Sequence, residues 1–309
     1  MLIAFAPIWA LTAVGFLVGR SRVLGNLAVD VLGRFVFYVA MPAALLSMLT
    51  RHPLTGLAGQ GFAAFAIGTV VAGGTGFALS RWVFHRPLGD QAIGGMAAGY
   101  VNAANLGIPV IVQVIGNASF VAVVLLLQTA IITPIILGTL DVAENATGDG
   151  HRWRRLITLP IRSPILIACV LGVLLGAFGV HLPGVIDNIT ALLGAAAVPT
   201  ALVALGLSLV SAGPADGEPP RPKEVAVAVA LKVLVQPAVT FVVARYLLGL
   251  HGTGLLAVVI CAGLPAAQNT FVYARAYGVD GRFPRDCIVA STALSMVTLT
   301  VAAALLKQT

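Results

Sequence analysis

The sequence predicts an all-α membrane protein with ten transmembrane helices in two inverted repeats of five helices. Apolar residues make up 59% of the 309 residues, charged residues only 9%, and the mean hydropathy is +1.01. A soluble domain has roughly 25% charged residues, so this chain has too few to cover a soluble surface. The composition therefore excludes a soluble globular enzyme, a disordered protein and a nucleic-acid-binding domain.

Charges and turn residues divide the chain into ten apolar segments. Each segment is long enough to cross roughly 30 Å of hydrocarbon as a helix. We expect the first to be a membrane span and not a removable signal, because Arg20 and Arg22 follow it and no basic residue precedes it, the reverse of the order in a secretory signal. We expect spans at residues 3–19, 28–50, 60–84, 92–115, 118–140, 161–180, 186–211, 225–248, 254–277 and 286–306.

The positions of the basic residues predict the orientation of the chain. When the spans alternate from an outside N-terminus, only Arg51, Arg245 and Lys307 of the 18 basic residues fall outside. This bias follows the positive-inside rule, and it explains the net charge of +7 without a nucleic-acid partner. We expect a multi-pass protein of the bacterial inner membrane, surrounded by bilayer lipid, with both termini outside.

The two halves carry matching glycines and prolines. Gly15 in the first span corresponds to Gly172 in the sixth at an offset of 157 (172 − 15), and Pro42 corresponds to Pro199 at the same offset. An odd number of spans in each half makes the second half run opposite to the first, as in many secondary transporters. We therefore predict a first repeat over residues 1–140, a cytoplasmic linker over 141–160 and a second repeat over 161–309. Accidental resemblance between glycine-rich helices is the alternative.

Spans 4 and 9 share a Gly-x-Pro step, Gly107-Ile108-Pro109 and Gly263-Leu264-Pro265. Proline removes a backbone donor and clashes with the preceding turn, so each span should divide into two half-helices. Broken backbone at that depth needs protein or a water-filled cavity around it. We expect the second half-helices to begin near Pro109 and Pro265 and to direct free N–H groups and positive dipole ends into a cavity.

Uncharged polar side chains accompany both breaks. Their amides add donors without a full charge, and the glycines permit close backbone approach, so the predicted pocket suits a carboxylate. The alternative is a proline kink packed against neighbouring helices, with the amides bonded between helices. The candidate binding residues are Asn102, Asn105, Gly107, Pro109, Gly263, Pro265, Gln268 and Asn269.

Four more residues, Gln128, Thr133, Lys232 and Tyr273, are secondary candidates. Gln128 and Thr133 either face the cavity or bond between helices. Snorkelling to the interface explains Lys232 and Arg34, and guidance of an anion is the other interpretation of Lys232. Three hydroxyl residues of the tenth span fit helix packing: Ser291, Thr292 and Ser295.

Charged and metal-ligating groups are missing from the expected mid-membrane positions. No Asp or Glu is expected there, and no His/Asp/Glu cluster has metal-ligand spacing. The sequence therefore predicts no catalytic residues, no metal and no cofactor. Coupling to Na⁺ or H⁺ stays open, because unwound carbonyls can bind Na⁺ without an acidic ligand. The three cysteines Cys169, Cys261 and Cys287 fit reduced core residues.

The chain resembles bacterial members of the auxin efflux carrier family, related to the plant PIN exporters and to bacterial malonate-type carriers. The resemblance rests on residues 32–46 of span 2, on Asn102 seven residues before Pro109, and on Leu264-Pro265 with residues 274–278. It implies crossing helices 4 and 9, a scaffold of spans 1, 2, 6 and 7, a homodimer and an elevator-like movement. It also implies that Asn102 contacts the carboxylate.

The predicted function is transport of a small organic anion, such as a malonate-type dicarboxylate or an auxin-like acid, by alternating access. An inside-negative potential drives one negative charge outward by about 2.3 kcal/mol per 100 mV, so uncoupled transport favours efflux. The alternatives are a Na⁺-coupled carrier of the bile-acid type, an intramembrane enzyme and a non-transporting membrane sensor.

Overall fold

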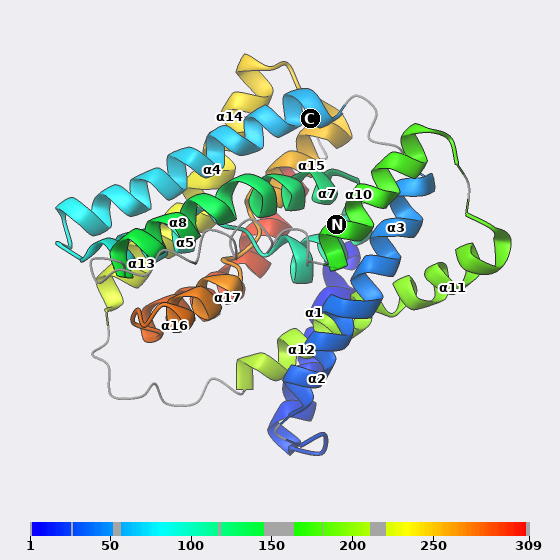
Figure 1. The fold of residues 1–309 in the computed structure, drawn as a ribbon, viewed down its shortest axis with the longest axis horizontal. Helices are drawn as coiled ribbons and strands as arrows, with labels where there is room; N and C mark the ends of the chain where they lie inside the picture. Colours follow the sequence, from blue (N-terminus) through cyan, green and yellow to red (C-terminus); the bar gives the residue numbers. More distant parts are fainter. Residues whose placement is uncertain are drawn as a thin grey trace. The chain divides into compact units, whose positions relative to one another are not determined.

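The computed structural model describes residues 2–25, 27–51, 57–116, 119–144, 164–180, 182–210 and 221–306. Within these ranges the regular structure is helical apart from one isolated β-bridge (Figure 1), which confirms the predicted all-α class. Among the described residues, four helical segments are long and apolar enough to cross a membrane, by length and composition: Gly59–Trp82, Gly184–Ala204, Pro222–Leu247 and Arg282–Leu306.

The chain forms two compact units, and each combines segments that are far apart in the sequence. The first unit consists of Met1–Ala58, Ala103–Leu126 and Ile161–Pro214. The second consists of Gly59–Asn102, Leu127–Pro160 and Ala215–Thr309. Each unit therefore draws on both predicted repeats. The predicted linker falls on residues 141–160, of which 145–160 lie outside the described residues.

The helices of the first unit follow the apolar segments expected from the sequence. Several are short because a turn or a change of helix type interrupts them. They are α1 (Leu2–Ser21), α2 (Ala28–Phe35), η1 (Val36–Ala40), α3 (Met41–Arg51), η2 (Ala103–Gly107), α6 (Ile108–Ile115), α7 (Ser119–Leu127), α10 (Pro164–Ala177), α11 (Gly184–Ala195) and α12 (Ala197–Val210).

Glycines let helices of the first unit pack with their backbones in contact. A Cβ atom at Gly15 of α1 would collide with the Val203 carbonyl of α12, and one at Gly206 of α12 would collide with the backbone of α1. A Cβ atom at Gly172 of α10 would lie 2.8 Å from the Leu49 Cβ of α3. Close packing of small residues is a main cause of helix association in lipid. These glycines therefore join α1 to α12 and α10 to α3.

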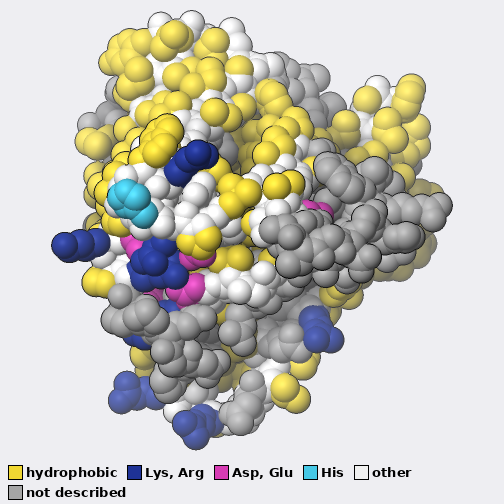
Figure 2. All heavy atoms as spheres, turned by 60° about the vertical axis from the view of Figure 1, so that its left-hand side comes forward, with side chains coloured by type: hydrophobic (Ala, Val, Ile, Leu, Met, Phe, Trp, Pro, Cys, Tyr) yellow, Lys and Arg dark blue, Asp and Glu magenta, His cyan; other side chains and the backbone are white. Residues whose placement is uncertain are grey.

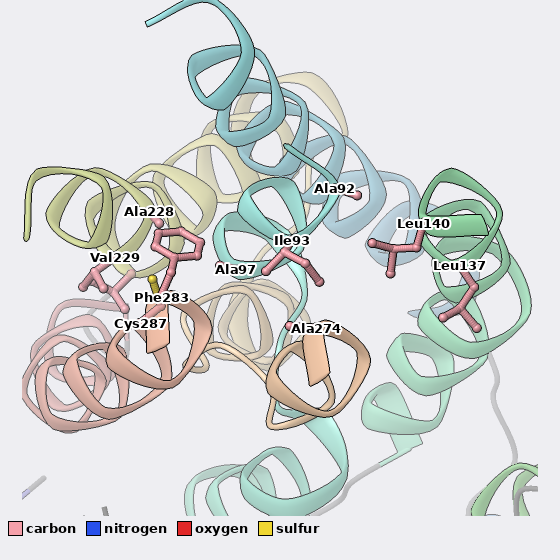
Figure 3. Close-up of a cluster of buried hydrophobic side chains, with 11 residues drawn as sticks. Ala92, Ile93, Ala97, Leu137, Leu140, Ala228, Val229, Ala274, Phe283 and Cys287 are labelled. Atoms are coloured by element: carbon pink, nitrogen blue, oxygen red, sulfur yellow. The ribbon is translucent and has the colours of Figure 1, made fainter. Parts of the chain in front are cut away.

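The helices of the second unit surround a core of apolar side chains. They are α4 (Leu57–Trp82), α5 (Leu88–Gly99), η3 (Gln128–Ile132), α8 (Thr133–Glu144), α13 (Pro222–Ala230), η5 (Leu231–Val235), α14 (Gln236–Val242), η6 (Val243–Leu247), α15 (Gly252–Ala262), α16 (Asn269–Ala276) and α17 (Arg282–Leu306). Figure 3 shows Ile93 and Ala97 of α5 between Leu140 of α8 on one side and Phe283 of α17 on the other. The helix α5 is thus packed at the centre of this core.

Four π-helical turns in the described residues are each followed, two residues after their end, by a proline: Pro42, Pro109, Pro134 and Pro237. Proline has no N–H, and its ring clashes with the carbonyl four residues earlier. A π-turn is wider than an α-turn, so it can move that carbonyl away from the ring. The helix therefore continues through these prolines.

An ionic cluster connects several segment ends of the second unit. Arg221, directly before α13, lies 2.6 Å from an Asp90 carboxylate oxygen of α5 and 3.0 Å from one of Asp280, beyond α16. The Arg86 guanidinium donates to both carboxylate oxygens of Glu224 in α13, and this charge-assisted bond raises the pKa of Arg86. Figure 2 shows acidic and basic side chains gathered on a face with many hydrophobic side chains. The cluster fixes the start of α5 against the start of α13.

Asp141 is a buried carboxylate that the sequence placed in a loop. The structure corrects this, because α8 continues to Glu144 and leaves the Asp141 side chain only 2% exposed. Neither carboxylate oxygen has a hydrogen-bond partner among the described residues. The apolar pattern of span 5 ends at Leu140, so periodicity gave no signal that the helix buries the next residue.

We expect Gly206→Ala to lower the thermal unfolding midpoint of the purified protein, because the new methyl group would collide with α1. Gly33→Ala is the control, since a Cβ atom there meets open space and alanine in a helix is better than glycine by roughly 0.5–1 kcal/mol. Circular dichroism in detergent measures both midpoints. Equal midpoints in the two variants would contradict the packing of α1 on α12.

We expect Asp141→Leu to raise the unfolding midpoint, because burial of a polar group without a hydrogen bond costs roughly 1–3 kcal/mol in proteins. Asp187→Leu is the control, since Asp187 lies in the first turn of α11, where a negative charge is favourable. The control should not gain stability. A lower midpoint for Asp141→Leu than for the unmodified protein would show that the carboxylate is stabilising.

Candidate functional site

The fourth and ninth predicted spans are both interrupted in the second unit. The helix α5 ends at Gly99, and residues 100–102 are not helical. The helix α15 ends at Ala262, and residues 263–268 are not helical before α16 begins. The prediction that both spans are broken is therefore confirmed.

The two non-helical stretches pair with each other. The Asn102 N–H donates to the Pro265 carbonyl over 2.8 Å, and the Ala267 N–H donates to the Tyr100 carbonyl over 3.1 Å. These bonds form an antiparallel bridge, in which each stretch supplies one donor and one acceptor to the other. The two broken spans therefore meet at their breaks, and the meeting point is called the crossing below.

The two half-helices that follow the breaks agree with the predicted start in the fourth span and differ from it in the ninth. Gly107 is helical, with φ −60° and ψ −50°, and Pro109 lies within the first turn of α6, so helical structure already resumes at Ala103. In the ninth span, helical structure resumes at Asn269. The start near Pro109 is confirmed for the α-helix α6, which begins at Ile108, whereas the start near Pro265 is wrong, because α16 begins at Asn269. A π-turn accommodates Pro109, and the pairing with residues 100–102 keeps the backbone after Pro265 extended.

Two glutamines bind backbone carbonyls that the break in the fourth span leaves without helical partners. The Gln236 Nε2 donates to the Gly99 carbonyl over 3.1 Å and to the Thr69 Oγ1 over 3.0 Å. The Gln128 Nε2 donates to the Val101 carbonyl over 3.0 Å. Both glutamine side chains are fully buried or nearly so. Of the two predicted roles for Gln128, the structure supports interhelical hydrogen bonding.

A lysine and a serine bind backbone groups of the ninth span at its break. The Lys232 Nζ donates to the carbonyl of Ala262, the last residue of α15, over 2.9 Å and to the Gln236 Oε1 over 2.5 Å. The Ser291 Oγ accepts from the Ala266 N–H over 3.1 Å. Because the Lys232 side chain has 0% exposure, the prediction that it snorkels to the interface is wrong.

Hydroxyl and amide groups gather beside the crossing. The Tyr100 hydroxyl hydrogen-bonds the Thr133 Oγ1 over 3.0 Å, and the Tyr273 side chain packs against the buried cluster that contains Tyr100. Met96 packs against the Tyr100 ring. The structure thus brings Thr133 and Tyr273 together beside Tyr100, and Asn269 begins the helix that carries Tyr273. Tyr100 was not among the predicted site residues, although its place directly after Gly99 in a polar stretch was the available signal.

The predicted amides of the second unit differ in their exposure. Asn102 is 3% exposed, whereas Gln268 and Asn269 are exposed side chains at the start of α16. The N-terminal end of a helix carries a partial positive charge. The start of α16 therefore combines two exposed amide groups with a positive dipole end.

The remaining predicted site residues belong to the first unit. Asn105 is half-buried in η2, and Gly107 and Pro109 are buried at the junction of η2 and α6. Their role in binding stays a prediction. Among the residues that the structure describes, no group of three His, Cys, Asp or Glu side chains is arranged to hold a metal ion. Cys261 and Cys287 are buried free thiols.

Comparison with known proteins adds independent evidence. The profile of the family described as "Membrane transport protein" matches residues 1–148 and 153–303. An "Uncharacterized transporter" from Methanothermobacter thermautotrophicus is 26% identical over 94% of this chain and 93% of its own length. A "Putative malonate transporter" from Rhizobium meliloti is 24% identical over 95% of this chain and 92% of its own length.

We expect Gln128→Leu to reduce the free energy of unfolding by about 1–3 kcal/mol, because it leaves the buried Val101 carbonyl without its side-chain donor. Gln113→Leu in α6 is the matched control, since the Gln113 side chain is exposed. Denaturant unfolding in detergent, followed by circular dichroism, measures both. Equal stability of the two variants would contradict the role of Gln128 at the crossing.

Proposed function

Because the chain belongs to the membrane transport protein family, we propose that it carries a small organic anion across the inner membrane by alternating access. The family and the relatives are transporters and not enzymes, so the chain is a multi-pass membrane transporter. The substrate class, the mechanism and the direction of transport are the proposed parts.

The crossing is the observation that carries this proposal. Unwound backbone inside a bilayer is tolerated only against protein or beside a water-filled cavity. Here the bonds between Asn102 and Pro265 and between Ala267 and Tyr100 satisfy backbone groups of the unwound stretches. The ends of α5 and α15 and the start of α16 adjoin these stretches. Discontinuous helices of this kind bind substrates in many secondary transporters.

A carboxylate is the proposed ligand. Gln268 and Asn269 supply exposed amide donors at the positive end of α16, which suits an anion. The Tyr100 hydroxyl, bonded to the Thr133 Oγ1, is a further proposed donor. The malonate in the name of one relative agrees with a dicarboxylate substrate. We include Asn102 in the proposed site because the family resemblance implies that it contacts the carboxylate.

We also propose the inverted repeat and the elevator-like movement on structural grounds. Gly15 of α1 packs on α12, and its repeat equivalent Gly172 of α10 packs on α3. The first helix of each predicted repeat therefore packs, through an equivalent glycine, on the second span of the other repeat. The division into two compact units fits a carrier in which one unit moves the substrate while the other stays fixed. We propose a homodimer because the family resemblance implies one.

Flux measurements in proteoliposomes test the function. We expect the protein to transport labelled malonate or indole-3-acetate, and an imposed potential, negative on the side that holds the labelled anion, should speed its exit. Asn102→Ala should reduce flux by about tenfold or more, since a hydrogen bond to a charged group contributes roughly 1.5–3 kcal/mol. Asn188→Ala, at an exposed position of α11, should leave flux unchanged.

The same assay separates the alternatives. Flux that collapses when Na⁺ is replaced by choline would favour a Na⁺-coupled carrier. Binding of the labelled acid without any flux would favour a membrane sensor. Normal flux in Asn102→Ala, measured on a variant that folds and inserts like the unmodified protein, would remove Asn102 from the substrate site.

A further inference from the structure

Two helices of the second unit end at one buried polar group. The last residue of α5 is Gly99 and the last residue of α15 is Ala262, and the side chains of Gln236 and Lys232 bind the carbonyls of these two residues. Gln236 also accepts from Lys232 over 2.5 Å. One lysine and one glutamine, four residues apart, therefore connect the C-terminal ends of both broken helices.

The charges at this point favour a cation. A helix C-terminus carries a partial charge of roughly −0.5, and two such ends share the Lys232–Gln236 pair. Unwound backbone carbonyls and the C-terminal ends of half-helices also coordinate Na⁺ or H⁺ in other transporters. The Lys232 ammonium occupies such a position, because both of its acceptors are a backbone carbonyl and an amide oxygen.

No carboxylate among the described residues balances Lys232. The basic partners in the ion pairs of the described residues are arginines. The Lys232 side chain is fully buried. An isolated buried charge is very costly, so the helix ends are the partners that make this position suitable for an ammonium. The α13 neighbour Lys223, by contrast, is exposed.

We propose that Lys232 is a built-in cation that takes the place of a bound monovalent metal ion at the crossing. The lysine positions the ends of α5 and α15, so that the crossing assembles without an added cation. The proposal rests on the proposed transport function in one respect, because it concerns how the broken helices of that transporter interact with cations. It predicts that shortening Lys232 creates a cation site whose ligands include the Ala262 carbonyl and the Gln236 side-chain oxygen.

Thermal unfolding in detergent tests the proposal, with NaCl compared with choline chloride at equal ionic strength. The unmodified protein and the control Lys223→Ala should unfold at the same temperature in both salts. Lys232→Ala should unfold several degrees lower in choline chloride and recover a large part of that loss in NaCl. A loss of equal size in both salts, or failure to fold in either, would overturn the proposal, as would no loss.

Lys232→Gln is a milder second variant, because an amide can donate to the Ala262 carbonyl without carrying a charge. We expect it to be less stable than the unmodified protein in choline chloride. If Lys232→Gln is as stable as the unmodified protein, the charge is not required and the proposal is overturned. Flux is not measured in either experiment, so an error in the substrate assignment leaves these outcomes unchanged.

Discussion

The structure depends on one constraint: a backbone polar group that leaves its helix inside a bilayer must find another partner. The breaks in the fourth and ninth spans free several such groups at one place. Each break supplies partners to the other, and the side chains of Gln128, Gln236, Lys232 and Ser291 bind further groups. Each broken helix is stabilised here by hydrogen bonds from the other broken helix and from side chains of neighbouring elements.

This arrangement connects the fold to transport. The same breaks that need partners leave exposed amides at the start of α16, the helix that also carries Tyr273. The packed core around α5 and the ionic cluster between α5 and α13 hold the elements that carry these groups. The polar groups proposed to bind an anion therefore belong to elements whose positions are fixed by packing and by buried hydrogen bonds.

Apolar segments and the prolines of spans 4 and 9 were sufficient to predict the all-helical class and the breaks in these two spans. They did not give the residue at which helical structure resumes, since a proline is accommodated by a π-turn at Pro109 but lies in extended backbone at Pro265. The partners of Lys232 and Gln236 lie 30 and 137 residues away, so no local pattern indicates them. Asp141 was misplaced because the apolar segment ends before the helix does.

The pairing of residues 100–102 with residues 263–268 is the central claim, and disulfide trapping tests it most directly. Val101 and Ala266 lie opposite each other in the bridge, where a non-hydrogen-bonded antiparallel pair has Cα atoms about 4.5 Å apart, within the range of a disulfide. Val101→Cys/Ala266→Cys in native membranes should cross-link under mild oxidation, whereas Val101→Cys/Val301→Cys should not. Absence of the first cross-link, with both thiols shown to be reactive, would contradict the account.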